Sequence, residues 1–194
     1  MFRRIAVLAV ALSMGAVTVA CTGPAQPSPT PTPSPTFACI PEAGGDPVPC
    51  GPIEYEQAQK RDKLYADAEA VYRRYWTEMN RLATEKSPPF TDVLESTTAG
   101  KFRDNVVALL SPEHHAVRVS GQSKLERVAR LPGLSRDGST VALLVCTDSR
   151  DGTYVDASSG AALPGIVSEQ RLFLGPAGGS LRIVNSEIRE IDQC

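Results

Sequence analysis

The sequence predicts an α+β domain in which helices come first and antiparallel strands follow, preceded by a signal peptide and a proline-rich linker. Three observations predict this order. Apolar residues recur every three or four positions between residues 53 and 86, which is the period of a helix. From residue 116 onward, apolar runs of strand length are separated by Gly, Pro and Asp-Gly turns. Helices followed by strands are typical of the α+β class.

The first 20 residues have the parts of a secretory signal. Arg3 and Arg4 are followed by an uncharged run and then by Cys21. The ending TVAC, residues 18–21, resembles the lipobox of bacterial lipoproteins, with Thr18 where that family usually has Leu. The resemblance implies that the Cys21 thiol receives a diacylglycerol, and that Cys21 becomes the first residue of the mature chain.

Three other interpretations of this start stay open. A retained transmembrane helix needs about 20 apolar residues, whereas this run is shorter and is interrupted by Ser13, Gly15 and Thr18. A cleaved signal without lipid would leave Cys21 as an odd thiol in an oxidising compartment. The adjacent arginines also occur in signals of the twin-arginine export route, although two arginines alone are a weak indication.

Residues 21–36 form the predicted lipid-anchored linker. The segment after Cys21, TGPAQPSPTPTPSPT, is rich in proline and carries no charge. Proline restricts φ and donates no backbone hydrogen bond, so the segment is expected to be an extended, semi-rigid spacer. At about 3.1 Å per residue it would reach up to roughly 45 Å from the membrane.

The charge balance limits the classes of partner. With 20 basic and 22 acidic side chains, the formal net charge is −2, so the chain lacks the basic surface that nucleic-acid binding needs. Anionic lipid would not be attracted either, and membrane attachment is expected to rest on acyl chains. We therefore expect a lipid-anchored protein on the extracytoplasmic face of the cell membrane. A protein of the cell envelope is its candidate partner, and nucleic acid is not.

The cysteine count supports lipidation. If Cys21 carries lipid, an even number remains in a compartment where disulfides persist, and four cysteines allow three pairings. We prefer Cys39 with Cys50, which flank a Pro/Gly turn in a predicted strap over residues 37–52. Cys146 with Cys194 would then tie the last residue to a central strand. A metal or redox site would need a CxxC-type pair, which the sequence lacks.

One long helix is predicted over residues 53–86, because Pro88 and the residue after it cannot continue it. Tyr72, Tyr75 and Trp76 lie on or near its apolar face, where such spacing is typical of core packing. The same three side chains are the candidates for lining a ligand pocket. The apolar face as a whole comprises Leu64, Ala68, Val71 or Tyr72, Tyr75, Met79 and Leu82.

Two shorter helices and five strands complete the prediction. Thr91 is the expected N-cap of a helix through Leu94. A further helix is expected over residues 100–110, with an apolar side formed by Phe102, Val106, Leu109 and Leu110. The strands are expected at 116–120, 125–131, 140–147, 167–174 and 181–191, as an antiparallel meander. Residues 141–145 are apolar on both faces, which predicts a central strand.

This order of elements resembles the NTF2-like, cone-shaped fold, in which N-terminal helices pack on a curved antiparallel sheet. Residues 139–148 (STVALLVCTD), residues 154–156 (YVD), the terminal Cys194 and the lipobox resemble uncharacterised bacterial lipoproteins with such a domain. The resemblance covers residues 55–194, within a predicted domain over 53–194. It implies a fold and no particular activity, because this fold hosts enzymes, binding modules and assembly components alike.

The sequence offers few groups for chemistry. His114 and His115 are neighbours, so on a strand they point to opposite faces and a surface role is expected. No GxSxG motif accompanies them. Asp148, Asp151 and Asp156 surround a turn, but their spacing does not match an EF-hand loop, which favours turn chemistry. We expect no catalytic residue, no metal and no cofactor.

The expected function is a non-catalytic binding or assembly module of the cell envelope. The alternative is a small-molecule enzyme that uses the cone pocket, which predicts two or more titratable groups converging in a deep apolar cavity. Membership of a multi-protein envelope machine predicts an exposed apolar patch of several hundred Å² on the sheet.

Overall fold

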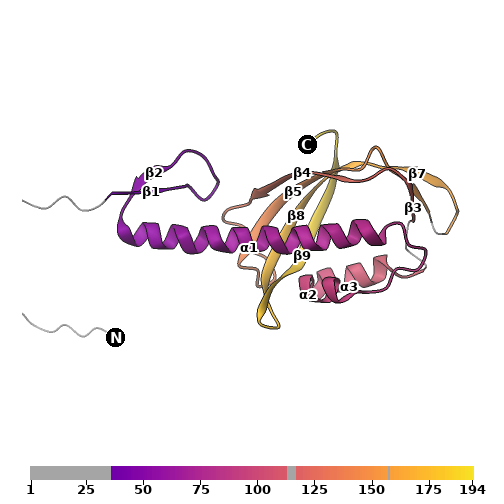
Figure 1. Ribbon diagram of the computed structural model, residues 1–194, viewed down its shortest axis with the longest axis horizontal. Helices are drawn as coiled ribbons and strands as arrows, with labels where there is room; N and C mark the ends of the chain where they lie inside the picture. Colours follow the sequence, from indigo (N-terminus) through magenta and orange to yellow (C-terminus); the bar gives the residue numbers. More distant parts are fainter. Residues whose placement is uncertain (1–35, 113–116, 157) are drawn as a thin grey trace, which may run out of the picture. The chain divides into compact units, whose positions relative to one another are not determined.

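The computed structural model describes residues 36–112, 117–156 and 158–194. In this part of the chain, a long helix packs on one face of a four-stranded antiparallel sheet, and two shorter helices contact the last strand (Figure 1). A three-stranded sheet and a β-hairpin complete the arrangement. The predicted α+β class is confirmed.

The long helix is α1 (Pro52–Leu82). It begins one residue before the predicted residue 53, because the carboxylate of Glu54 accepts a hydrogen bond from the backbone N–H of Gly51 at 2.8 Å and so closes the first turn. It ends four residues earlier than the predicted residue 86. A turn forms there instead, in which the Thr84 hydroxyl donates to the carbonyl of Arg81 at 3.1 Å and satisfies an acceptor at the helix end.

The two short helices are α2 (Asp92–Thr97) and α3 (Gly100–Leu109). Thr91 caps α2 as predicted, with its hydroxyl oxygen accepting from the N–H of Leu94 at 3.4 Å. The helix runs on to Thr97, beyond the predicted end at Leu94. The apolar side of α3 also differs in one position: Leu109 is 46% exposed, because it borders the pocket described below.

The four-stranded sheet is the main sheet, and its strands have the order β4-β5-β8-β9, all antiparallel. β5 lies between β4 and β8, so the prediction of a central strand is confirmed. The face that packs on α1 is the inner face, where Leu143, Leu172 and Tyr72 belong to one buried core. The strands are β4 (Lys124–Arg130), β5 (Val141–Asp148), β8 (Val167–Ala177) and β9 (Ser180–Ile191).

The predicted unbroken meander of five strands is wrong. β6 and β7 are inserted between β5 and β8, and β3 pairs with β6 in a second sheet of order β3-β6-β7. Strands as short as β6 and β7 fall below the length at which alternation of apolar and polar residues can be recognised. The second sheet consists of β3 (Val117–Ser120), β6 (Thr153–Val155) and β7 (Ala162–Pro164).

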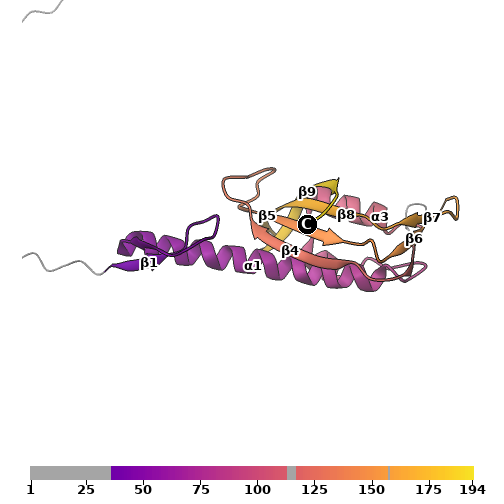
Figure 2. The ribbon, with the colours of Figure 1, turned by 90° about the horizontal axis from the view of Figure 1, so that it is seen from above.

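The strap is a β-hairpin that packs on the N-terminal part of α1 (Figure 2). The ring of Phe37 stacks on Tyr55 with 4.6 Å between centroids. The Tyr65 hydroxyl donates to the carboxylate of Glu42 at 3.0 Å. These contacts join the segment before the helix to the helix itself. The hairpin strands are β1 (Phe37–Cys39) and β2 (Val48–Cys50).

The described part of the chain contains two disulfide bonds, in the pairing preferred from the sequence. Cys39 is joined to Cys50 across the strap hairpin. Cys146 is joined to Cys194, so the last residue of the chain is held against the central strand β5. Cys146 is fully buried.

Candidate functional site

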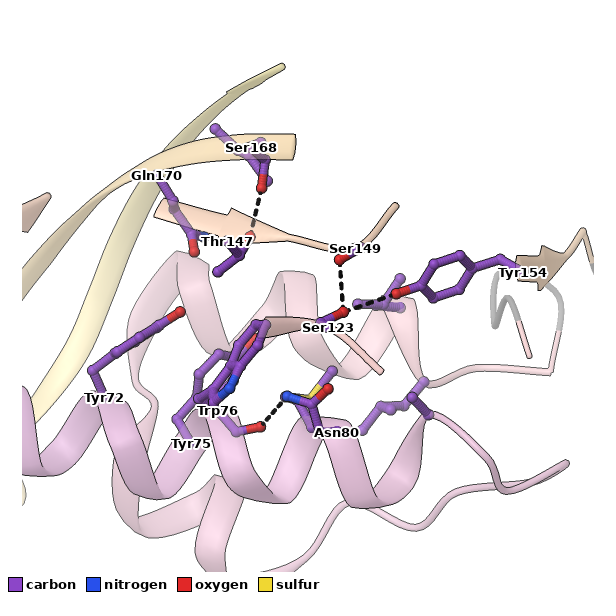
Figure 3. A pocket seen from close by; sticks show the side chains of 15 residues that line it. Tyr72, Tyr75, Trp76, Asn80, Ser123, Thr147, Ser149, Tyr154, Ser168 and Gln170 are labelled. Carbon is purple, nitrogen blue, oxygen red and sulfur yellow. Dashed lines mark hydrogen bonds between the residues drawn. The ribbon is translucent and has the colours of Figure 1, made fainter. Parts of the chain in front are cut away.

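A pocket of about 380 Å³ lies between the C-terminal half of α1 and the inner face of the main sheet (Figure 3). Its lining comes from α1, from the end of α3, and from residues on or next to β4, β5, β6, β8 and β9. Pockets in folded domains commonly combine apolar walls with a few placed polar groups, and this pocket has both.

One wall is aromatic and is formed by Tyr72, Tyr75 and Trp76 of α1. Residues three and four apart lie on one face of a helix, and the Tyr72 ring centroid is 6.3 Å from those of both Tyr75 and Trp76. Tyr75 also contacts Phe102 of α3 edge-on at 5.2 Å. The three predicted pocket-lining candidates therefore meet at one pocket, where they also pack on the core.

The mouth of the pocket is aliphatic. Ile188 of β9 is 66% exposed, and Leu109 at the end of α3 is 46% exposed. Met79 and the buried Leu110 continue this apolar lining towards the interior. An apolar ligand in the pocket would therefore cover side chains that otherwise face water, which is a favourable change.

A cluster of three hydroxyl-bearing side chains joins three elements at the far end of the pocket. The hydroxyl oxygens of Ser123 and Ser149 lie 2.6 Å apart, and those of Ser123 and Tyr154 lie 3.1 Å apart, so these groups are hydrogen-bonded. Ser123 precedes β4, Ser149 follows β5 and Tyr154 lies in β6. The second sheet therefore contributes to the pocket through Tyr154.

A second polar group lies on the inner face of the main sheet. Thr147 of β5 and Ser168 of β8 are register partners, and their hydroxyl oxygens are hydrogen-bonded at 2.9 Å. Gln170 lies two residues further along β8, on the same face, and its amide also lines the pocket. Together these side chains provide hydroxyl and amide groups opposite the aromatic wall.

Among the residues that the structure describes, no Asp, Glu, Lys, Arg or His side chain lines the pocket. Burial raises the pKa of Tyr72 and that of Tyr75, so both hydroxyls stay protonated at neutral pH. The remaining described lining residues carry apolar, hydroxyl or amide side chains. Such a site can bind through apolar contact and neutral hydrogen bonds.

The polar lining was missed in the sequence, although a signal for part of it exists. On the inner face of β5, Leu143 and Val145 are apolar, and the next residue on that face is Thr147. On the inner face of β8, the apolar Leu172 is preceded by the polar Gln170. A switch from apolar to polar on a buried face marks a cavity or a polar partner. Ser123, by contrast, precedes its strand and carries no such signal.

The three aspartates around the predicted turn each have a partner of their own. Asp148 is paired with Arg150 at 2.6 Å, and Asp151 with Lys124 at 2.6 Å. Asp156 accepts hydrogen bonds from the two serines that follow it. Within the described ranges, no group of three or more His, Cys, Asp or Glu side chains is arranged to hold a metal ion. These contacts agree with turn chemistry.

Four further predictions fall on residues outside the described ranges. They are the signal peptide over residues 1–20, the lipidation of Cys21, the extended spacer that follows it, and the surface role of His114 and His115. No helix in the described ranges is both long enough and apolar enough to cross a bilayer.

Comparison with known proteins gives structural likeness only. No family model matches the chain, and no curated protein matches it. Aln2 from a Streptomyces species is 15% identical with a TM-score of 0.38, and the match covers 66% of this chain and 91% of Aln2. The intermembrane space region of the chloroplast protein ARC6 is 13% identical with a TM-score of 0.41, and that match covers 64% of this chain and 95% of the ARC6 region. Likeness at this level carries no argument about function.

Proposed function

We propose that this protein is a lipid-anchored binding module on the extracytoplasmic face of the cell membrane. Its NTF2-like domain binds an uncharged, mostly apolar small molecule in the pocket under α1. The observation that carries the proposal is the composition of that pocket: an aromatic wall and an aliphatic mouth face hydroxyl and amide groups that carry no charge at neutral pH.

The polar groups of the pocket support binding over catalysis. Acid–base catalysis is most efficient with a group whose pKa lies near the working pH. The raised pKa values of Tyr72 and Tyr75 are far from that range, so the two hydroxyls act as hydrogen-bond donors and acceptors. Ser123 and Thr147 each have a hydrogen bond to another hydroxyl group, which fits a role in shaping the polar side of a binding site.

The strap and α1 support a role for the anchor in setting the position of the pocket. Along the chain, the proposed lipidation site Cys21 is followed by the proline-rich spacer and then by the strap. The strap packs on the first half of α1. From Ile53 to Trp76 the helix rises by about 35 Å. The pocket therefore lies at the opposite end of α1 from the point where the linker joins the domain.

Binding can be measured through Trp76, because it is the single tryptophan of the chain and it lines the pocket. We expect N-phenyl-1-naphthylamine, an uncharged aromatic probe, to change Trp76 fluorescence on titration. Its sulfonated analogue, 8-anilinonaphthalene-1-sulfonate, should bind about tenfold or more weakly, since burying an uncompensated anion is costly.

A matched pair of variants tests the location. Ile188→Glu places a carboxylate at the mouth and should weaken binding of the uncharged probe by about tenfold or more. Ile53→Glu makes the same change at a 73% exposed position in the first turn of α1 and should leave binding unchanged. Equal effects of the two variants, or equal affinity for both probes, would contradict the proposal.

A further inference from the structure

A second cavity adjoins the pocket. It has a volume of about 390 Å³ and shares three lining residues with the pocket: Trp76, Asn80 and Ser123. These side chains therefore form the boundary between the two cavities, and Figure 3 shows Asn80 donating to the backbone carbonyl of Trp76, at 3.0 Å. We call the second one the polar cavity, because its lining differs in kind from that of the pocket.

The polar cavity is lined mostly by uncharged hydrogen-bonding side chains. Thr77 of α1 and Thr84 in the turn after α1 extend it, and Gln122 closes it from the segment before β4. Both Thr77 and Gln122 are exposed, so their polar groups can reach a bound molecule. Apart from Trp76, the lining contains no large apolar side chain in the described residues.

Among the described residues that line the polar cavity, one is charged, and it is already paired. The guanidinium of Arg81 is paired with Glu78 at 2.9 Å and with Glu85 at 2.6 Å. An anionic group would have to compete with two carboxylates for this one cation. A cationic group would lose its hydration without meeting a carboxylate among the described residues of the lining. The cavity therefore favours a neutral group.

We propose that the pocket and the polar cavity form one site for an amphipathic molecule with an apolar chain and a neutral, polyhydroxylated head group, such as a sugar. The chain occupies the pocket, and the head lies in the polar cavity. A sugar ring has an apolar C–H face and a rim of hydroxyl groups. Trp76 supplies a flat apolar surface, while Thr77 and Gln122 supply donors and acceptors. This inference rests on the proposed function, because it places the chain in the same pocket.

The test uses probes that share one chain and differ in the head group. Octyl β-glucoside, 1-octanol, octyl sulfate and octyltrimethylammonium are titrated by displacement of N-phenyl-1-naphthylamine. The three surfactants are kept below their micelle concentrations, and 1-octanol is kept below its solubility limit. We expect the glucoside to bind about tenfold more tightly than 1-octanol, which corresponds to one or two net hydrogen bonds. The two charged probes should bind more weakly than the glucoside.

The double variant Thr77→Val, Gln122→Met removes the head-group contacts while keeping side-chain size. It should lower glucoside affinity about tenfold and leave 1-octanol affinity unchanged. Gln59→Met, an exposed position nearer the start of α1, is the control and should change neither.

The outcomes separate the two proposals. If 1-octanol and N-phenyl-1-naphthylamine bind but the glucoside gains nothing over 1-octanol, the inference about the head group is wrong and the pocket stands. If the double variant weakens all four probes equally, the head group does not lie in the polar cavity and the inference is also wrong. If no uncharged probe binds, the proposed function fails as well.

Discussion

Asp156 shows how a single side chain organises a turn. Its Oδ1 atom accepts hydrogen bonds from the backbone N–H and hydroxyl groups of Ser158, at 3.0 and 2.6 Å, and of Ser159, at 2.7 and 2.8 Å. Hydrogen bonds to the charged form of a carboxyl favour that form. They hold the pKa of Asp156 at about 2, below the usual 3.8.

This lowered pKa predicts a pH dependence with a defined sign. Because the folded state binds the proton of Asp156 less tightly than the unfolded chain, its contribution to stability is fully present above about pH 4. It is lost as the pH falls through about 2. In a carboxyl ¹³C NMR titration of the folded protein, we expect Asp156 to titrate near pH 2.

Two serine variants define the cause of that shift. Ser159→Ala removes one of the four hydrogen bonds and should move the Asp156 midpoint upwards. Ser180→Ala changes a serine at the start of β9, away from Asp156, and should leave the midpoint in place. A midpoint near pH 4 in the wild-type protein would show that the turn does not hold the carboxylate as described.

At the scale of the elements, the junction of β7 and β8 depends on a close backbone approach. A Cβ atom on Gly165 would lie 1.7 Å from the carbonyl oxygen of Ser149, a distance that real Cβ atoms essentially never show. The backbone N–H of Gly165 also donates to the carbonyl of Gly152 at 3.0 Å. The inserted strands β6 and β7 are thereby held against the end of β5, where Ser149 lines the pocket.

We expect Gly165→Ala to lower the free energy of unfolding by about 3 kcal/mol, because the overlap is with backbone that cannot rotate away. Gly160→Ala is the comparison. Gly160 has a φ of +69° but open space around it, so the cost should be only about 1 kcal/mol. Urea unfolding measures both.

The same comparison has a functional readout. The added Cβ atom of Gly165→Ala should displace Ser149, which lines the pocket, and so weaken the binding of N-phenyl-1-naphthylamine. The Gly160→Ala variant should bind the probe as the wild type does. If Gly160→Ala proved the more destabilising of the two, backbone strain and not close approach would govern this region.

At the scale of the whole molecule, the proposal assigns different roles to the five cysteines of the chain. The two disulfides use Cys39, Cys50, Cys146 and Cys194. The remaining one, Cys21, is the proposed site of the acyl chains. The strap disulfide stabilises the hairpin next to the linker, and the second disulfide ties the end of the chain to β5.

Intact-mass analysis of the native protein tests this assignment of lipid to Cys21 and of disulfides to the other four cysteines. We expect a chain that starts at Cys21 and carries covalent lipid, and whose mass increases on reduction by four hydrogen atoms. The Cys21→Ala variant should lose the lipid and leave the membrane fraction while keeping the same increase. A native chain that still begins at Met1, or a disulfide at Cys21, would overturn the anchored arrangement.

The helices and the main strands were predictable because their signals are local. The three- and four-residue spacing along α1, the Thr91 cap and the apolar run of β5 are each contained in a short stretch of sequence. The Tyr72, Tyr75 and Trp76 candidates were found in the same way, since one helix positions all three.

By itself, then, the sequence determined the α+β order, the central strand and a preferred cysteine pairing. Only the tertiary structure decided that β6 and β7 stand outside the main sheet, and that Ser123 meets Ser149 and Tyr154, which are 26 and 31 residues away. The physical reason is range: helix and strand periods express contacts between near neighbours. A pocket is assembled from side chains that approach one another only after distant strands have paired.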